Sequence, residues 1–181
     1  ADMRNRARSE RRVIRPKSFD FELMQARVRH QLAKSPVDAV NLFRDQTEKG
    51  GTEAAAGWYG LALAHIEAGQ PVKAKQALEK AMRPDPDNLA FVIASSEIDT
   101  AMGQHERAIA RLKNRLSLSP GNHPLTIAYA DALWQAGLPH VAAQLLKNLS
   151  KRTPEDPGVW YRLAEVQGLA GDIIGLHQSR A

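Results

Sequence analysis

The chain has 181 residues, contains no cysteine and carries a formal net charge of +5 at neutral pH. The absence of cysteine excludes a disulfide framework and thiol chemistry. The longest run of small and apolar residues, Ala54–Ala64, is too short to span a bilayer.

The first segment, residues 1–18, is interpreted as a basic connector. Residues 1–34 hold ten Lys/Arg against four Asp/Glu, a net charge of +6, whereas the rest holds fifteen against sixteen, a net charge of −1. A cluster of cations can bind nucleic acid or an anionic membrane. However, the first eighteen positions contain no aromatic residue for base stacking. We therefore favour a solvated connector and expect no nucleic-acid partner. The first residues are charged rather than apolar, so no signal peptide is visible in them.

Residues 19–54 have the pattern of a degenerate leading repeat. Asp20 is placed to cap a first helix, and Ser35-Pro36 to begin a second one. At an offset of 35 residues Ala39 corresponds to Ala74, so this unit aligns with the one that follows. We interpret it as the N-terminal cap of a stack of repeats.

Residues 55–88 predict a pair of helices. Apolar residues recur at intervals of three and four before Gly69, which is suited to end a helix in the left-handed conformation. Pro71 fits the first turn of a second helix. Small residues at Ala62 and Ala74 allow the two helices to approach closely. Asn88, or Asp87 before it, is placed to cap the next helix.

This unit recurs with a period of 34 residues. The repeats are predicted at residues 55–88, 89–122 and 123–156, followed by a partial repeat at 157–181. The middle repeat departs from the pattern with Ser95, Ser96 and Asp99, where larger or apolar residues are usual. A single hairpin cannot bury its own apolar stripe, so a period of this length indicates a stack. The recurring positions are Gly69, Gly103, Gly137 and Gly171; Ala74, Ala108 and Ala142; and Pro86, Pro120 and Pro154.

The pattern resembles the tetratricopeptide repeat family. The resemblance implies an all-α solenoid of antiparallel helix hairpins, with about ten helices in this chain, and a role in protein–protein interaction. It is carried by Trp58, Leu61, Ala62, Gly69, Ala74, Leu78, Ala81 and Pro86.

The opening residues carry a second resemblance. Ala-Asp-Met-Arg-Asn-Arg-Ala at 1–7 is similar to the segment that follows the catalytic domain in a family of bacterial periplasmic zinc metallopeptidases with C-terminal tetratricopeptide repeats. The resemblance implies an upstream peptidase domain that would hold the zinc, and a periplasmic location. It also implies two kinds of partner, the outer-membrane β-barrel assembly machinery and its client proteins.

The chain itself lacks the pattern of an enzyme. A zinc peptidase needs two His one helical turn apart with a Glu between them, and the nearest fragment, His105-Glu106, lacks the second His. No two of the six histidines are three or four positions apart, and no Gly-x-Ser-x-Gly elbow is present. We therefore expect no catalytic residue, metal site or cofactor within these residues.

Function is expected in the concave groove that the first helices of stacked hairpins line. Two ladders, with one residue in each repeat, are predicted there: an apolar and aromatic ladder, and an acidic ladder of Glu97, Asp131 and Glu165. Some of these positions can instead be core between paired helices. The predicted binding set is Tyr59, Leu63, Ile93, Glu97, Ile127, Asp131, Trp134, Tyr161, Arg162 and Glu165.

The ladders also indicate the kind of ligand. Tetratricopeptide domains that clamp a C-terminal carboxylate use Lys and Asn at such positions, and this sequence does not. Because an acidic groove repels a carboxylate, we expect an extended apolar or basic polypeptide. The alternative is a stand-alone adaptor or co-chaperone scaffold without a linked enzyme, which would lack an upstream His-Glu-x-x-His motif. An RNA-binding repeat is disfavoured by the period of 34 and the apolar ladder.

Overall fold

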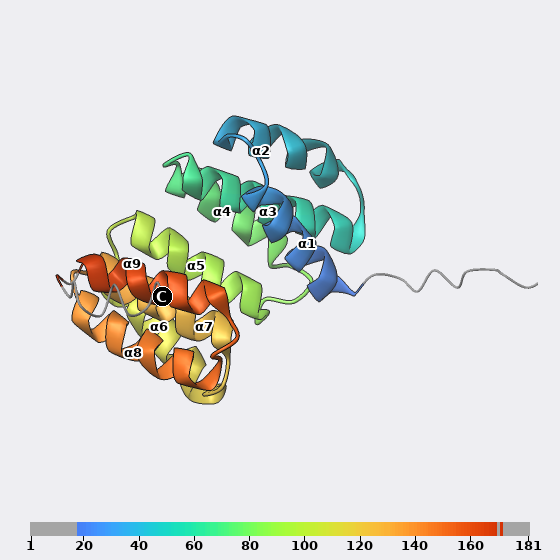
Figure 1. Ribbon diagram of the computed structural model, residues 1–181. Helices are drawn as coiled ribbons and strands as arrows, with labels where there is room; N and C mark the ends of the chain where they lie inside the picture. Colours follow the sequence, from blue (N-terminus) through green and yellow to red (C-terminus); the bar gives the residue numbers. More distant parts are fainter. Residues whose placement is uncertain (1–17, 170, 172–181) are drawn as a thin grey trace, which may run out of the picture.

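The computed structural model describes residues 18–169 and 171, and this part of the chain is a stack of helices (Figure 1). The predicted connector, apart from Ser18, and the second helix of the last partial repeat lie outside the described residues. Nine α-helices and one 3₁₀ helix form the described part, which agrees with the predicted all-α solenoid. They are α1 (Phe19–Gln31), α2 (Pro36–Arg44), η1 (Asp45–Glu48), α3 (Gly51–Glu67), α4 (Pro71–Ala81), α5 (Leu89–Ala101), α6 (His105–Leu118), α7 (His123–Gln135), α8 (Pro139–Arg152) and α9 (Pro157–Leu169).

The recurring glycines end the first helix in each of the three full repeats, as predicted. Gly69, Gly103 and Gly137 have φ values of 67°, 74° and 80°, the left-handed region that glycine adopts without a steric penalty. At the first of these turns Gly69 N donates to the carbonyl of Ile66 and Gln70 N donates to the carbonyl of His65. These two bonds satisfy the last carbonyls of the helix in a Schellman motif. The turn between the two helices is therefore stabilised by hydrogen bonds within the hairpin.

Helices α1, α2, α5 and α7 are each capped at their start by a short polar side chain. The Asn88 and Asn122 carboxamides accept from backbone N–H groups of α5 and α7 at 3.0 Å, which confirms the prediction for Asn88. Ser35 caps α2 as expected. The prediction for α1 was wrong: Ser18 is its N-cap and accepts from Phe21 N, while Asp20 lies in the first turn. In the first turn, the negative charge of Asp20 interacts favourably with the helix dipole.

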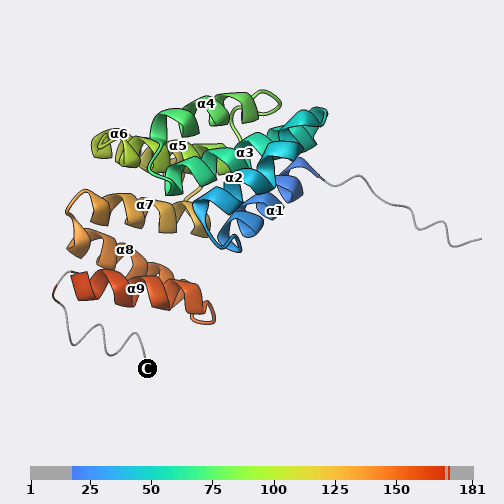
Figure 2. The same ribbon diagram turned by 90° about the horizontal axis from the view of Figure 1, so that it is seen from above.

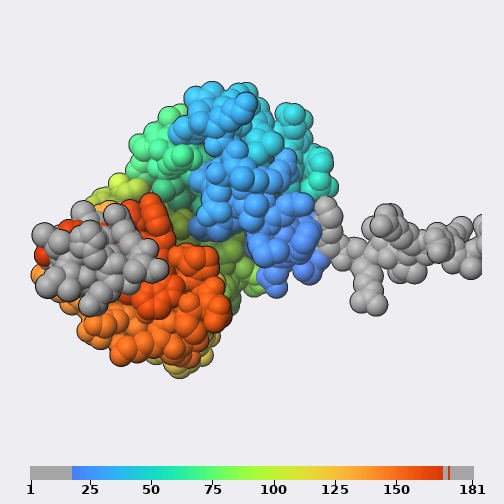
Figure 3. Space-filling view, in the orientation of Figure 1, coloured from blue at the N-terminus to red at the C-terminus, as the bar shows by residue number. Residues whose placement is uncertain are grey.

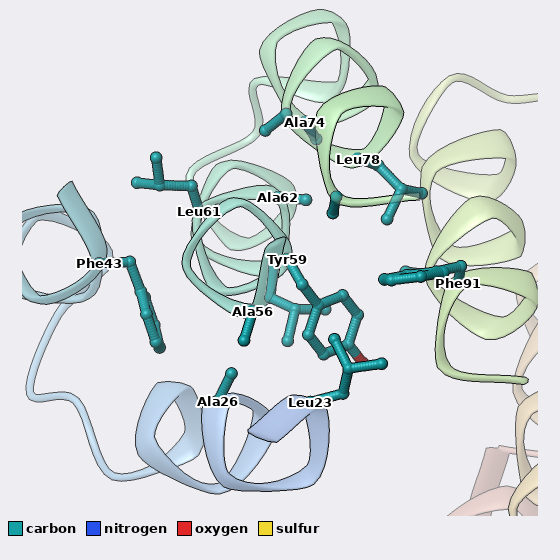
Figure 4. Packing of buried hydrophobic residues seen from close by; sticks show 14 of the residues in the cluster. Leu23, Ala26, Phe43, Ala56, Tyr59, Leu61, Ala62, Ala74, Leu78 and Phe91 are labelled. Carbon is teal, nitrogen blue, oxygen red and sulfur yellow. The ribbon is translucent and has the colours of Figure 1, made fainter. Parts of the chain in front are cut away.

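The core runs between the hairpins along their small and apolar faces. Ala62 and Ala74 are completely buried where α3 meets α4, and Leu78 is nearly so (Figure 4). Phe43 of the leading hairpin is also fully buried, which places it in the same role as Leu78. The rings of Tyr59 and Phe91 meet edge to face with centroids 5.7 Å apart, so α3 also packs on α5.

The polar residues of the middle repeat have partners within their own hairpin. Ser96 is buried and donates to the carbonyl of Val92 at 2.9 Å. Asp99, 6% exposed, accepts from Nε and NH2 of Arg111 at 3.2 and 2.9 Å. A partly buried ion pair therefore joins α5 to α6.

Gly60 provides a test of the packing between α2 and α3. A Cβ at this position would lie 2.4 Å from the ring of Phe43, which is itself fully buried. We expect Gly60→Ala to lower the free energy of unfolding by about 1–3 kcal/mol through overpacking, measured by urea denaturation. Gly50→Ala is the control, because nothing lies within 4 Å of its added Cβ. Equal losses in both variants would contradict the packing described.

The stack curves so that its two ends face each other. In Figure 1 α5 lies between the leading hairpin and α9, and Figure 2 shows the helices following an arc from α1 and α2 through α5 and α7 to α9. The space-filling view shows a hollow between α1, in blue, and α9, in orange-red (Figure 3). This hollow is the inner side of the curve.

Candidate binding groove

The hollow between α1 and α9 is lined by the first helix of every hairpin. It has a volume of about 440 Å³, and we call it the groove. Both apolar and charged side chains line the groove. The lining residues that matter below are Arg27, Ile66, Ile93, Glu97, Ile127, Asp131 and Arg162.

The apolar ladder is not a continuous surface. Tyr59 is completely buried and Ile93 is 9% exposed, whereas Ile127 is half-buried and Tyr161 is 71% exposed. Tyr59 is covered because α1 and Phe91 pack over it. The expectation that Tyr59 faces the groove is therefore corrected: Tyr59 is not among the residues that line it, and its hydroxyl accepts a hydrogen bond from Arg27 Nε.

The other predicted positions divide in the same way. Leu63 is 4% exposed and belongs to the core, so it is also corrected. Trp134 is half-buried and packs against the core cluster of the C-terminal repeats. Glu165 is half-exposed and is paired with Arg162. Of the predicted set, the residues that line the groove are Ile93, Glu97, Ile127, Asp131 and Arg162.

Arg27 of α1 pairs with the first acid of the groove. Its NH1 and NH2 atoms donate to the two carboxylate oxygens of Glu97 at 3.0 and 3.2 Å, and its Nε donates to the Tyr59 hydroxyl at 2.8 Å. This fork geometry is the strongest form of an Arg–carboxylate contact. Arg27 was not in the predicted set, and it joins three helices from two sides of the groove.

Arg162 of α9 pairs with the other two acids. Its Nε lies 3.2 Å from Asp131 Oδ1, and its NH1 donates to Glu165 Oε2 at 2.8 Å. The acidic ladder therefore carries two guanidinium groups against three carboxylates. In the lining of the groove itself the carboxylates of Glu97 and Asp131 are balanced by the guanidinium groups of Arg27 and Arg162.

A second hollow of about 670 Å³ continues the groove toward the N-terminal ends of α5 and α7. It shares Arg27 and Ile93 with the first. Three carboxylates, of Asp20, Asp85 and Asp87, lie along its wall. The combined path is long enough to follow several residues of an extended chain, and it becomes more acidic toward this end.

Asp131 makes the groove sensitive to pH. Burial raises the pKa of its carboxyl from 3.8 to about 6; Arg162 opposes this shift and Glu97 adds to it. A raised folded-state pKa means that the favourable contribution of Asp131 is complete below about pH 3.8 and is lost as the pH rises through about 6.

Asp131→Asn removes this dependence. Relative to that variant, we expect the wild-type chain to lose about 1–3 kcal/mol of stability between pH 3.8 and about 6. Urea denaturation across this pH range measures the difference, and Glu155→Gln, at an exposed turn, is the control. A difference between wild type and Asp131→Asn that stays constant with pH would contradict the assignment.

Two sequence profiles of the tetratricopeptide repeat family match the chain, at residues 23–88 and 99–164. The chain is 30% identical over 168 residues to the β-barrel assembly-enhancing protease of Escherichia coli (strain K12) and 26% identical over 172 residues to that of Yersinia pestis. These alignments cover 92% and 94% of the chain but only 34% and 35% of the relatives. The chain therefore spans about a third of their length.

A solved structure has the same fold. A tetratricopeptide repeat protein from Parabacteroides merdae superposes with a TM-score of 0.72 at 12% identity, covering 90% of this chain and 63% of the other. None of the helices in the described residues has the length and hydropathy needed to cross a membrane.

Proposed function

Because the chain belongs to the tetratricopeptide repeat family, whose stacked hairpins bind other proteins on their concave side, we propose that the groove binds an extended segment of a partner polypeptide. The observation that carries this proposal is the hollow of about 440 Å³ lined by residues of α1, α3, α5, α7 and α9. It combines an apolar floor with charged side chains held in place by their partners. Such a lining suits side chains of alternating character on an extended chain.

The chemistry of the lining favours apolar and basic residues in the ligand. Ile66, Ile93 and Ile127 offer apolar contact, and in the groove and the second hollow together five carboxylates face three guanidinium groups. Asp131 Oδ1 is paired with Arg162 at 3.2 Å but accepts no hydrogen bond of good geometry from the described residues, so a donor from a ligand would improve its surroundings. An acidic segment would add a like charge beside Glu97 and Asp131, which costs binding energy.

The proposed setting is the periplasm, in the partner-binding arm of a zinc metallopeptidase that acts in outer-membrane β-barrel assembly. Its support is the similarity to the β-barrel assembly-enhancing proteases over 92% of the chain, together with the resemblance of residues 1–7. The groove would then hold client proteins, or components of the assembly machinery, for a zinc site in a separate peptidase domain. A photo-crosslinker at Ile127 in cells should capture outer-membrane β-barrel proteins or their assembly factors, and crosslinks to cytoplasmic proteins would contradict this setting.

Binding in the groove can be tested with synthetic peptides. A peptide that alternates Val and Lys should bind the wild-type chain more tightly than one that alternates Val and Glu. Asp131→Lys should weaken the first complex about tenfold and strengthen the second, measured by fluorescence anisotropy. Glu155→Lys adds the same charge at an exposed turn outside the groove and should leave both affinities nearly unchanged. If the two variants behave alike, the groove is not the binding site.

A further inference from the structure

Apolar side chains line much of the second hollow. Met24, which is 58% exposed, lies on its α1 side, and Leu89, Ile93 and Pro124 lie on the side of α5 and α7. The hollow has a volume of about 670 Å³. A concave surface of this kind, with a few polar groups around it, is typical of a binding site.

The acidic wall of this hollow has no cationic partner. The carboxylates of Asp20, Asp85 and Asp87 are on exposed side chains. Within residues 18–169 none of the three forms an ion pair with Lys, Arg or His. Asp20 and Asp85 accept hydrogen bonds from Asn88 Nδ2 at 2.7 and 3.1 Å, which hold the two carboxylates near each other.

The arginines of the lining leave this wall uncompensated. The Arg27 guanidinium is held by Glu97. Arg115 donates through NH2 to the backbone carbonyl of Asp87 at 3.3 Å, and not to a carboxylate. The second hollow therefore keeps an excess of negative charge, unlike the groove, and it favours a segment that carries both apolar and basic side chains.

Residues 11–17 of the same chain have this composition. Their sequence is Arg-Arg-Val-Ile-Arg-Pro-Lys, with four basic side chains, three apolar ones and no acid. They lie outside the described residues, and they lead directly to Ser18, the N-cap of α1. Asp20, two positions further on, already belongs to the wall of the second hollow.

The distances allow the segment to reach the whole hollow. Seven residues span up to about 23 Å when extended, and α1, with 13 residues, is about 20 Å long. A segment joined to its site by a few residues acts at an effective concentration on the order of millimolar. Even a weak intrinsic affinity is then enough to fill the hollow.

We propose that residues 11–17 bind in the second hollow of their own chain and compete there with external polypeptides. The arginines face the carboxylates of the wall, and Val13 and Ile14 supply apolar contact. Arg27 and Ile93 line both hollows, so the bound segment closes one end of the path through the groove. The competition rests on the proposed function, whereas the binding of the segment itself does not.

A photo-crosslinker in place of Met24 tests this binding in the 181-residue chain without any added ligand. Mass spectrometry of the monomeric product at low protein concentration should locate crosslinks within residues 11–17. A crosslinker in place of Leu118, which is 75% exposed on α6, is the control and should not reach these residues. Absence of crosslinks from position 24 to residues 11–17, or crosslinks to a second copy in their place, would overturn the proposal.

Charge reversal tests the role of the acidic wall in the same assay. The double variant Asp85→Lys/Asp87→Lys should lower the crosslink yield from position 24 at least about tenfold, because attraction of the basic segment becomes repulsion. Glu155→Lys adds a positive charge at an exposed turn outside both hollows and should leave the yield nearly unchanged. Equal yields in all three chains would show that the carboxylates do not hold the segment.

Competition is measured with the peptide that alternates Val and Lys. A variant in which Gln replaces the three arginines of the segment should bind this peptide about tenfold more tightly than the wild type, because the competitor no longer fills the hollow. The replaced residues are Arg11, Arg12 and Arg15.

The matched control removes the same charge outside the segment. Gln in place of Arg4, Arg6 and Arg8 should leave the affinity for the peptide nearly unchanged. Equal gains in both triple variants would reveal a general effect of net charge and would overturn the proposal. If the crosslinks form but no variant binds the peptide, the proposed function fails and the binding of the segment stands. If the peptide binds but the crosslinks do not form, only the binding of the segment fails.

Discussion

Ala74→Glu should disrupt the α3–α4 hairpin and the repeats that pack on it. Ala74 has no exposed surface and lies against α3 beside Ala62, which is also completely buried. A Glu side chain cannot fit there without separating the helices, and its carboxylate would lose hydration without gaining a partner. We expect a loss of at least about 3–5 kcal/mol and a broad thermal transition by circular dichroism, because each repeat is stabilised by its neighbours.

Ala110→Glu separates this effect from helix propensity. Ala110 is exposed on α6, so the same substitution there leaves the packing unchanged and should shift the melting temperature very little. If Ala74→Glu melts like the parent, Ala74 does not lie between the helices and the register of the hairpins is wrong.

The second large effect is expected from Arg27→Ala. This change leaves the Glu97 carboxylate without its bidentate partner and removes the donor to the buried Tyr59 hydroxyl. Both side chains of the pair are 34% exposed, so water compensates part of the loss. We expect about 1–3 kcal/mol of destabilisation, measured by urea unfolding. Because α1 is then held less firmly, its backbone amides should also exchange hydrogen faster.

A double-mutant cycle isolates the Arg27–Glu97 contact. Arg27→Ala, Glu97→Gln and the double variant should show a coupling energy of at least about 0.5 kcal/mol. Arg107→Ala is the control, since Arg107 is 61% exposed and lies 3.6 Å from Asp99. If the losses in unfolding free energy of the two single variants simply add up in the double variant, the contact between Arg27 and Glu97 does not stabilise the protein.

The parts of the fold that could be predicted are those set by local chemistry. The left-handed turn at Gly69 and the cap at Asn88 depend on residues a few positions away, so the 34-residue pattern was enough. Ser18 was missed as the cap of α1 because Ser and Asp are both good caps and the sequence offers both.

The groove was less predictable, because the repeat pattern does not report what covers each position. Tyr59 and Tyr161 are equivalent in the period, yet the first is buried under α1 and the second is 71% exposed. Arg27 gave no signal either: at the offset of 35 that aligns the leading repeat it corresponds to Ala62, a small core residue. The repeat pattern predicted that the acidic residues lie on the concave side of the stack. Their ion pairs with Arg27 and Arg162 could be found only in the three-dimensional structure.

The Arg27–Glu97 pair has a mechanical consequence. A helical solenoid behaves as a spring, since bending is shared among small rotations between successive repeats. This pair ties α1 to α5 across 70 positions of sequence, so we expect the first three hairpins to resist bending more than the rest. Arg162 ties α9 only to α7, its neighbour along the inner side. When the ends are pulled apart, strain should concentrate beyond α5, and the C-terminal half should be the compliant arm that widens or narrows around a bound chain.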